Sequence, residues 1–156
     1  MVFAADKITF FQLMEAPERW ALFDHLPGAS TYAKNNFCLL GDAAHATTPH
    51  CGAGAGFAIE DAHLLSGLLT PDLIQSVDDV QHAFRAYDEM RRPRCEELVK
   101  KSRANGMLFD LQDGGDVTED ELWGDLEKKM QWVWNVDLVG MLENGRALLR
   151  KYKNAG

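Results

Sequence analysis

Four residues able to do chemistry lie within ten positions of each other, at 42–51. Asp42 follows the apolar run 37–40 and a single glycine, and His45, His50 and Cys51 come soon after it. A carboxylate at the end of a strand can accept a hydrogen bond from a ligand hydroxyl, as carboxylates do from ribose in dinucleotide sites. The two imidazoles and the thiol are candidates for proton transfer, nucleophilic attack or metal binding.

The segment after this carboxylate is poor in side chains. Pro49 is followed closely by Gly52, Ala53 and Gly54, and helical spacing begins at about Gly56. Glycines let backbone N–H groups approach a flat or anionic ligand closely, and the start of a helix adds partial positive charge. The order of strand, acidic turn, glycine-rich loop and helix therefore predicts a cofactor-binding corner.

Other pairings of these residues give different chemistry. His25 and Asp24 lie beside a predicted strand, and with His45, His50 or Asp42 they can form a general acid–base set in a cleft. The sequence does not fix the distances between them.

The same stretch offers metal ligands, but their spacing matches neither a helical HxxxH pair nor a zinc finger, so no metal site is predicted. Cys51 is either a reactive thiol, if the helix N-terminus lowers its pKa, or a small residue tolerated in the loop. Both interpretations of Cys51 stay open.

The stretch GDAAHATTPHCGAGAGFAIEDAHLL resembles the second flavin-contacting motif of class A FAD-dependent aromatic hydroxylases, the salicylate hydroxylase-like group. In that family the aspartate binds the ribityl chain of FAD, and the proline and glycine-rich segment lie along the isoalloxazine ring. The similarity continues upstream to Trp20 and downstream to Asp137, so it covers most of the chain. The resemblance implies these FAD-contacting residues: Gly41, Asp42, Pro49, Gly52, Ala53 and Gly54.

Part of the family pattern has no counterpart in this sequence. Family members carry an N-terminal GxGxxG on a first βαβ unit, which holds the FAD pyrophosphate. They also carry a central DG motif and most of a substrate-binding sheet. Here the glycine-rich segment is 52–56, and no strand–GxGxxG–helix unit precedes it. We therefore expect the C-terminal portion of a hydroxylase, with FAD as its ancestral cofactor. Whether this chain alone binds FAD stays open.

The elements that must position these residues are mainly helical. Strands are predicted at 20–24 and 37–40, with a turn at Asn35 and Asn36. The expected fold is mostly α with a few short strands (α+β), a truncated remnant of the α/β FAD-binding monooxygenase fold. Helices are predicted over 7–17, over 56–69, and from 79 to a C-cap at Asn105 and Gly106, with either a kink or an interruption at Pro93. Two more helices are predicted from a capping box at Thr118 and Glu121 and after an N-cap at Asp137.

A single domain over residues 1–156 is expected from the length. Within it, 1–36 would be a remnant of the substrate-domain edge, 37–105 the flavin-motif strand and helices, and 106–156 the C-terminal helices. Strand 37–40 is apolar enough to be buried on both faces and has few predicted neighbours. We therefore expect either a homodimer or an N-terminal partner chain to cover it.

Three groups of residues are given purely structural roles at this point. Glu60 and Asp61 would complement the dipole of the helix that begins before them, and the basic residues from Arg91 to Arg103 would form a solvated helix face. The four tryptophans are assigned to the core and to helix packing: Trp20, Trp123, Trp132 and Trp134.

Composition limits the partners and the compartment. The chain carries 24 acidic and 16 basic residues, a net charge of −8, which argues against nucleic acid or an anionic membrane as partner. No apolar run is long enough for a spanning helix, and the charged N-terminus does not fit a signal peptide. Three cysteines without a CxxC pair suggest a reducing compartment. A cytoplasmic protein is expected.

Three functions are compatible with these observations. The first is a FAD-dependent monooxygenase portion that acts on an aromatic or polyketide-like small molecule and is incomplete alone. The second is a flavin-free isomerase, cyclase or lyase that uses the vacated pocket for a hydrophobic compound. Its acid–base candidates are His25, His45, His50 and Asp42. The third is a non-catalytic binding module.

Overall fold

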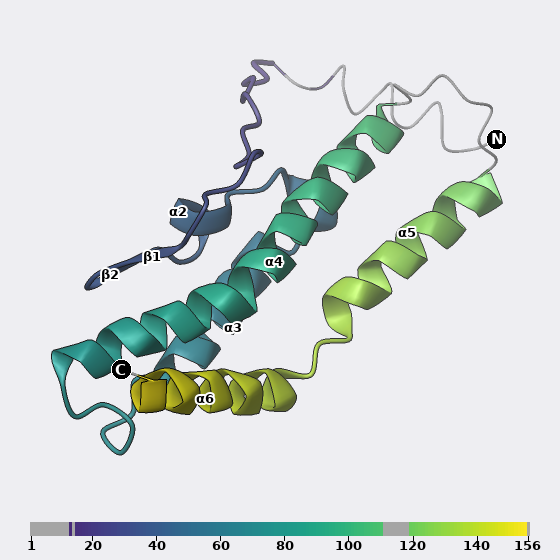
Figure 1. The fold of residues 1–156 in the computed structure, drawn as a ribbon. Helices are drawn as coiled ribbons and strands as arrows, with labels where there is room; N and C mark the ends of the chain where they lie inside the picture. Colours follow the sequence, from purple (N-terminus) through teal and green to yellow (C-terminus); the bar gives the residue numbers. More distant parts are fainter. Residues whose placement is uncertain (1–12, 14, 111–118, 156) are drawn as a thin grey trace.

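Helices make up most of the chain in the computed structural model, which describes residues 13, 15–110 and 119–155. The predicted fold class, mostly α with a few short strands, is confirmed. None of the helices in these described ranges is both long and apolar enough to cross a membrane. The elements, labelled as in Figure 1, are β1 (Ala33–Lys34), β2 (Phe37–Cys38), α2 (Asp42–His45), the 3-10 helix η1 (Pro49–Cys51), α3 (Gly54–Leu68), α4 (Val77–Phe109), α5 (Glu119–Trp134) and α6 (Leu138–Ala155).

The strands form one short antiparallel hairpin. Its turn lies at Asn35 and Asn36, as the sequence predicts, and Asn35 has a φ of 53°, a left-handed value that asparagine tolerates. The prediction of a buried strand over 37–40 is wrong, because pairing stops at Cys38 and the side chain of Phe37 is 80% exposed. A strand buried on both faces needs further strands and covering layers. In the described part of the chain β2 pairs with β1 alone.

Residues 20–24 carry no regular secondary structure, so the strand predicted there is wrong as well. Strands are defined by hydrogen bonds to a neighbour, and this segment lies beside none. It is tied to the flavin-like motif at His25, whose backbone N–H donates to the carbonyl of Ala46 (2.9 Å). The helix predicted over 7–17 lies outside the described residues, apart from 13 and 15–17, which are not helical.

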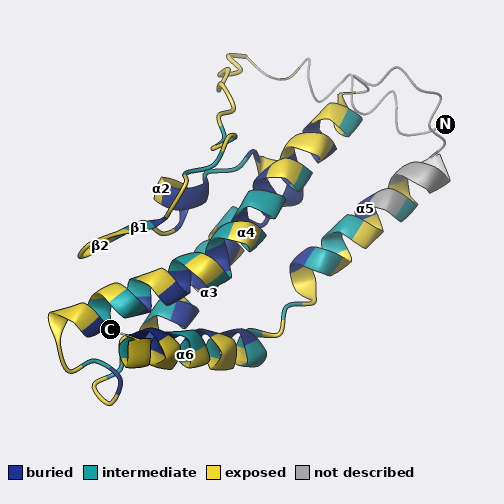
Figure 2. Ribbon diagram, in the orientation of Figure 1, coloured by how far each residue is buried: buried dark blue, intermediate teal, exposed yellow. Residues whose placement is uncertain are grey.

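The core lies where α3, α4 and α6 pack together. Figure 2 shows buried faces on these helices in dark blue and exposed faces in yellow. Leu64 and Leu68 of α3 are fully buried against this core, together with Tyr87 of α4 and Leu149 of α6. A Cβ on Gly145 of α6 would lie 2.9 Å from Leu64 Cδ1, so the missing side chain lets α6 approach α3 closely.

Helix α4 is the longest element and contacts most of the others. It starts with a capping box between Ser76 and Asp79 and runs for 33 residues through Pro93. Figure 1 shows one bent but continuous helix, which agrees with the predicted kink and not with an interruption. The predicted C-cap at Asn105 and Gly106 is wrong: both residues are buried inside α4, which ends three residues later at Phe109. Tertiary packing has overridden a local stop signal.

Helices α5 and α6 form where the sequence predicts them. The Asp137 side chain caps α6 by accepting a hydrogen bond from the backbone N–H of Gly140 (2.8 Å), which confirms that N-cap. The predicted capping box at Thr118 and Glu121 lies outside the residues whose side chains are described. The assignment of the tryptophans to the core is wrong for three of the four, whose exposures are 80% for Trp20, 61% for Trp123 and 66% for Trp134.

Candidate functional site

The Gly-Asp pair forms a sharp turn that presents one carboxylate to solvent. Gly41 is the N-cap of α2, and its φ of 58° with ψ of −143° is a conformation essentially restricted to glycine. The next residue, Asp42, is exposed at the start of this single-turn helix. Ala44 and His45, at its other end, point into the core. The turn and its short helix therefore expose the Asp42 carboxylate on one side and bury Ala44 and His45 on the other.

The buried support is a network centred on Asp61 of α3. Its Oδ2 accepts hydrogen bonds from the backbone N–H of Gly41 (2.9 Å) and from Nε2 of His45 (2.6 Å). Its Oδ1 accepts from Nε of Arg91 on α4 (2.7 Å). Asp61 and Arg91 have no exposed side-chain surface and His45 has 1%. One carboxylate thus joins α2, α3 and α4.

Sequence reasoning missed this network. Glu60 and Asp61 are not simply complements of the helix dipole, because Glu60 binds Arg91 and also Arg94 (2.9 Å). The predicted solvated face around Arg91 is wrong at that residue, which is fully buried. A signal was present, since Asp61 falls four residues after Phe57 and three before Leu64, on the apolar face of α3.

The network keeps Asp61 ionised. Burial alone would raise the pKa of this carboxyl group, but the hydrogen bonds from His45, Gly41 and Arg91 outweigh it and lower the pKa. The pKa of Glu60 is lowered against the same effect of burial by Arg94 and Arg91. Two buried carboxylates therefore face two guanidinium groups, so no charge in this part of the core is left uncompensated.

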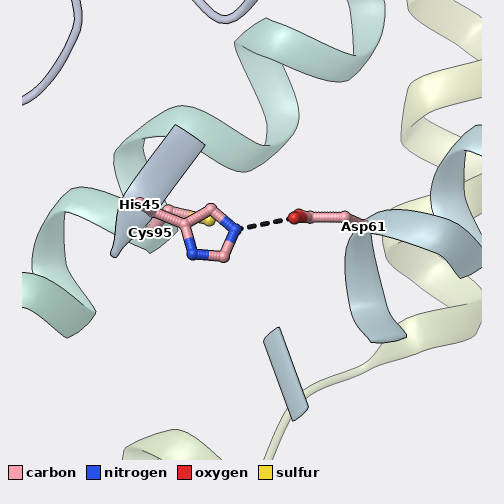
Figure 3. A group of neighbouring side chains, drawn as sticks. All are labelled: His45, Asp61 and Cys95. Carbon is pink, nitrogen blue, oxygen red and sulfur yellow. Dashed lines mark hydrogen bonds and ion pairs between the residues drawn. The ribbon is translucent and has the colours of Figure 1, made fainter. Parts of the chain in front are cut away.

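His45, Asp61 and Cys95 lie close enough to suggest a metal site, and Figure 3 shows the His45 ring nitrogen facing the carboxylate. The geometry is that of a hydrogen-bond network instead. The 2.6 Å between Nε2 and Oδ2 is a hydrogen-bond distance, whereas two ligands each about 2 Å from one zinc ion lie roughly 3 Å or more apart. Arg91 occupies the other carboxylate oxygen, and burial raises the pKa of Cys95 to about 12, which keeps the thiol protonated.

The loop that follows α2 exposes backbone rather than side chains. Gly52 ends η1 in the left-handed conformation, with φ 58° and ψ 21°. Helix α3 then begins at Gly54 without a side-chain cap, so the first N–H groups of the helix are not used by a capping side chain. A Cβ placed on Gly52 or Gly56 would meet no atom within 4 Å, so the surface beside these glycines is open. A flat ligand can lie against this surface.

This loop borders two hollows. The first, of about 310 Å³, lies between the start of α3 and the end of α5 and is lined by Gly52, Gly56, Phe57, Met130 and Trp134, among others. Arg94 holds the end of α5 in place, because it donates to the carbonyl of Val133 (3.1 Å) while it binds Glu60. The wall opposite the loop is thus mainly apolar and fixed by an ion pair.

The second hollow, of about 350 Å³, contains His50. It is also lined by Phe23, Met107 and the ion pair of Asp24 with Arg103. The His50 ring is half-buried, and its Nδ1 has no hydrogen-bond partner among the side chains and backbone that the structure describes. That nitrogen is itself buried beside Gly106, so the hollow offers an apolar wall, part of the imidazole ring and one charged pair.

The structure brings some of the predicted acid–base residues together and separates others. His50 and Asp24 line the same hollow, although Asp24 is held by Arg103. His25 is exposed and does not line that hollow, and His45 is buried in the network beneath the Gly-Asp turn. Of the three histidines predicted as catalytic, His50 alone has its ring in a hollow beside the loop.

Cys51 does not have the features of a reactive thiol. Its side chain is 4% exposed and contacts Asn105, whose Nδ2 lies 3.4 Å from Sγ. Burial raises the pKa of Cys51, although Ser102 and nearby lysines act in the opposite direction. The interpretation that the helix N-terminus activates this thiol is therefore wrong, and Cys51 packs as a small residue against α4.

Comparison with known proteins shows the family to which the segment around this site is similar. A family model described as FAD binding domain matches residues 18–102. A salicylate hydroxylase of Pseudomonas putida is 39% identical over 141 residues, which are 88% of this chain and 32% of that protein. The 6-methylsalicylate 1-monooxygenase atA of Aspergillus terreus is 40% identical over 128 residues, covering 81% of this chain and 28% of its own length.

The fold agrees with these similarities. A solved salicylate hydroxylase substrate complex superposes with a TM-score of 0.69 and 35% identity, over 76% of this chain and 29% of that one. The chain spans about a third of the length of the relatives it matches. The match therefore concerns one portion of a larger architecture.

Proposed function

Because this chain belongs to the FAD binding domain family, we propose that it forms the ribityl- and ring-binding portion of a FAD-dependent monooxygenase that acts on an aromatic or polyketide-like small molecule. The observation that supports this most is the surface made by the exposed Asp42 and the bare loop from Pro49 to Gly54. An exposed carboxylate on a glycine turn is followed in the chain by a loop that has open space beside Gly52 and Gly56.

The residues present fit a flavin. Asp42 would accept hydrogen bonds from ribityl hydroxyls, and Gly41 would bring the backbone close to the same chain. Pro49, Gly52, Ala53 and Gly54 would border the ring, and the uncapped N-terminus of α3 would face its polar edge. When bound, FAD supplies the oxygen chemistry of such enzymes, and the protein orients the substrate and excludes water.

His50 is the residue of this chain that we place beside the substrate. Its ring lines the second hollow, where Phe23 and Met107 provide an apolar wall for an aromatic compound. The proposed substrate class rests on this hollow and on the similarity to a salicylate hydroxylase and a 6-methylsalicylate 1-monooxygenase.

The nucleotide half of the cofactor needs a further unit. The sequence contains no GxGxxG motif after a strand, and the described residues show no second loop of this kind. We propose that the contacts to pyrophosphate and adenine come from a partner polypeptide or from another part of a longer one. This chain would then recognise the ring and the ribityl chain but not the adenine.

Flavin fragments test this proposal directly. The purified chain is titrated with riboflavin, FMN and FAD, and binding is followed by flavin fluorescence. Since riboflavin already contains the ring and the ribityl chain, the three ligands should bind within about threefold of one another. The variant Asp42→Asn should weaken all three by about tenfold, the typical value of a lost hydrogen bond to a charged group.

The matched control is Glu143→Gln, which removes the same charge from the exposed surface of α6. It should leave binding unchanged. Absence of riboflavin binding at any protein concentration would contradict the proposal, and so would an affinity for FAD that depends on its adenine.

The two alternative functions gain no support from the geometry. A flavin-free isomerase, cyclase or lyase would need its acid–base residues in one cleft, but His25 and His45 lie apart from His50. A non-catalytic module would not explain why a turn restricted to glycine at Gly41 is followed so soon in the chain by an open glycine loop.

A further inference from the structure

One buried carboxylate holds both ends of the short helix that presents Asp42. Asp61 Oδ2 accepts from the N–H of Gly41, the N-cap of α2, and from Nε2 of His45, its last residue. A helix of one turn is not stable by itself, because too few of its backbone hydrogen bonds are made. The shape of α2 therefore depends on contacts from outside it, and these two come from one carboxylate oxygen.

The carboxylate is itself fixed on its other side. Arg91 donates from Nε to Asp61 Oδ1 and from Nη2 to the carbonyl of Phe57 one turn earlier on α3 (3.1 Å). Neither Asp61 nor Arg91 has any exposed side-chain surface, so water does not compete for these hydrogen bonds. A movement of Asp61 would therefore disturb the contacts of α3 with both α2 and α4.

We propose that Asp61 is a positioning residue for the flavin site, which fixes the backbone at Gly41 and thereby the direction of the Asp42 side chain. The inference rests on the proposed function for the ligand, and on the hydrogen bonds alone for the mechanism of positioning. It also gives His45 a role other than proton transfer. His45 closes the far end of α2 from beneath, and its ring lies outside both hollows.

The variant that tests this is Asp61→Asn, with Asp79→Asn as its matched control. Asparagine keeps the shape of the side chain, but the NH2 group that replaces one carboxylate oxygen can only donate, so the side chain cannot accept from all of Gly41, His45 and Arg91. Asp79 is a comparable buried carboxylate elsewhere: it accepts from the backbone N–H groups of Gln75 (2.8 Å) and Ser76 (3.0 Å) and pairs with Lys153 (3.0 Å). Both variants are compared at a temperature where their circular dichroism matches the wild type.

Two measurements are made on each folded variant: amide hydrogen exchange at Gly41 by NMR, and riboflavin affinity by fluorescence. Asp61→Asn should speed exchange at Gly41 and weaken riboflavin binding by about tenfold or more, because small displacements of a binding group cost much of its effect. Asp79→Asn should change neither by more than about twofold.

Unchanged exchange at Gly41 in Asp61→Asn would overturn the inference, whether or not the wild type binds flavin. Wild-type affinity in a variant with fast exchange at Gly41 would overturn it too, since the turn would be loosened without consequence. Absence of riboflavin binding by the wild type would instead remove the proposed function, and Gly41 exchange would still decide whether Asp61 holds the turn.

A pair of variants at His45 keeps the test decisive if Asp61→Asn does not fold. His45→Gln can place an amide donor near the position of Nε2, whereas His45→Leu cannot donate. We expect His45→Gln to stay within about threefold of the wild-type riboflavin affinity and His45→Leu to lose about tenfold. Equal losses in the two variants would show that the ring volume matters and not the hydrogen bond, and would overturn the positioning role.

Discussion

Asp42 and Asp61 place the same side chain in opposite surroundings. Asp42 is exposed on a turn and free to bind a ligand, whereas Asp61 is buried below it and bound to three donors. At the scale of single residues, the proposed flavin site would depend on two carboxylates: Asp42, which the ligand would contact, and Asp61, which it would not.

Acid should destabilise the protein through Asp61. Its pKa is lowered in the folded state, so its contribution to stability is complete above the unfolded value of about 3.9 and is lost as the pH falls through the folded value. We expect the free energy of unfolding, measured with urea, to decrease steeply as the pH falls below about 4. In Asp61→Asn this decrease should be smaller, although the variant is less stable at pH 7 by about 3–5 kcal/mol. Parallel pH profiles for the two proteins would contradict the assignment.

The position of the His50 ring depends on the absence of a side chain at Gly106. A Cβ at Gly106 would lie 2.6 Å from Cε1 of His50, so in Gly106→Ala the ring must move. Helix propensity favours alanine by about 1 kcal/mol, and we therefore expect little net loss of stability. The NMR signals of the His50 ring should shift.

The control for Gly106→Ala is Gly124→Ala in α5, where a Cβ would meet no atom within 4 Å. This variant should be more stable by about 0.5–1 kcal/mol and should leave His50 unchanged. Unaltered His50 signals in Gly106→Ala would show that the ring does not need this space.

Local signals in the sequence predicted the exposed half of the site but not its support. The Gly41 turn and the Pro49–Gly54 loop could be recognised because glycine and proline restrict the backbone at their own positions. The pairing of Asp61 with Arg91 joins residues 30 positions apart, and no local rule specifies it. The burial of Arg91 followed from packing in three dimensions, so a basic stretch was assigned to solvent.

At the scale of elements, the same distinction separates helices from strands. The helix at Gly54–Leu68 and the cap at Asp137 follow from spacing and side-chain type nearby. Strands 20–24 and 37–40 needed neighbours that the described part of the chain does not provide. Helix α4 continues beyond Gly106, although glycine often ends a helix. Here the glycine leaves the space that the ring of His50 occupies against α4.

The cap of α6 gives a test at this scale. Asp137→Ala removes the acceptor for the N–H of Gly140 and should lower the free energy of unfolding by about 1 kcal/mol. Asp137→Asn keeps an acceptor oxygen and should cost much less. Urea unfolding followed by circular dichroism measures both. Equal stability of the alanine variant and the wild type would mean that the cap contributes nothing.

At the scale of the whole molecule, apolar surface gathers on the segment before the Gly-Asp turn. Trp20, Phe23 and Phe37 are each about 80% exposed, and Leu39 and Leu40 are more than 40% exposed. Exposed apolar groups in such number mark a surface used for association. We name residues 20–40 the apolar ribbon. Phe23 lines the hollow that contains His50, so a partner that covers this end of the ribbon would lie close to the proposed flavin site.

We predict that a second copy of the chain covers this ribbon when no other partner is present. Light scattering should then give a mass of twice the 17.5 kDa of one chain. Phe37→Ser should shift the equilibrium toward the monomer, because it removes apolar area from the contact. Val139→Ser on α6, where the valine is 68% exposed outside the ribbon, should not. A wild-type monomer at high concentration would contradict the prediction.

Because the thiol of Cys95 is buried in the core, the rate at which it is alkylated can report how often the core opens. The side chain has no exposed surface and its pKa is raised to about 12, so an alkylating reagent should not modify it in the folded state. Modification then requires opening of the contact between α3 and α4, and its rate at saturating reagent equals the opening rate. Mass spectrometry over hours would time this opening. A bound flavin should slow it, since a ligand that binds only the closed form makes opening less frequent.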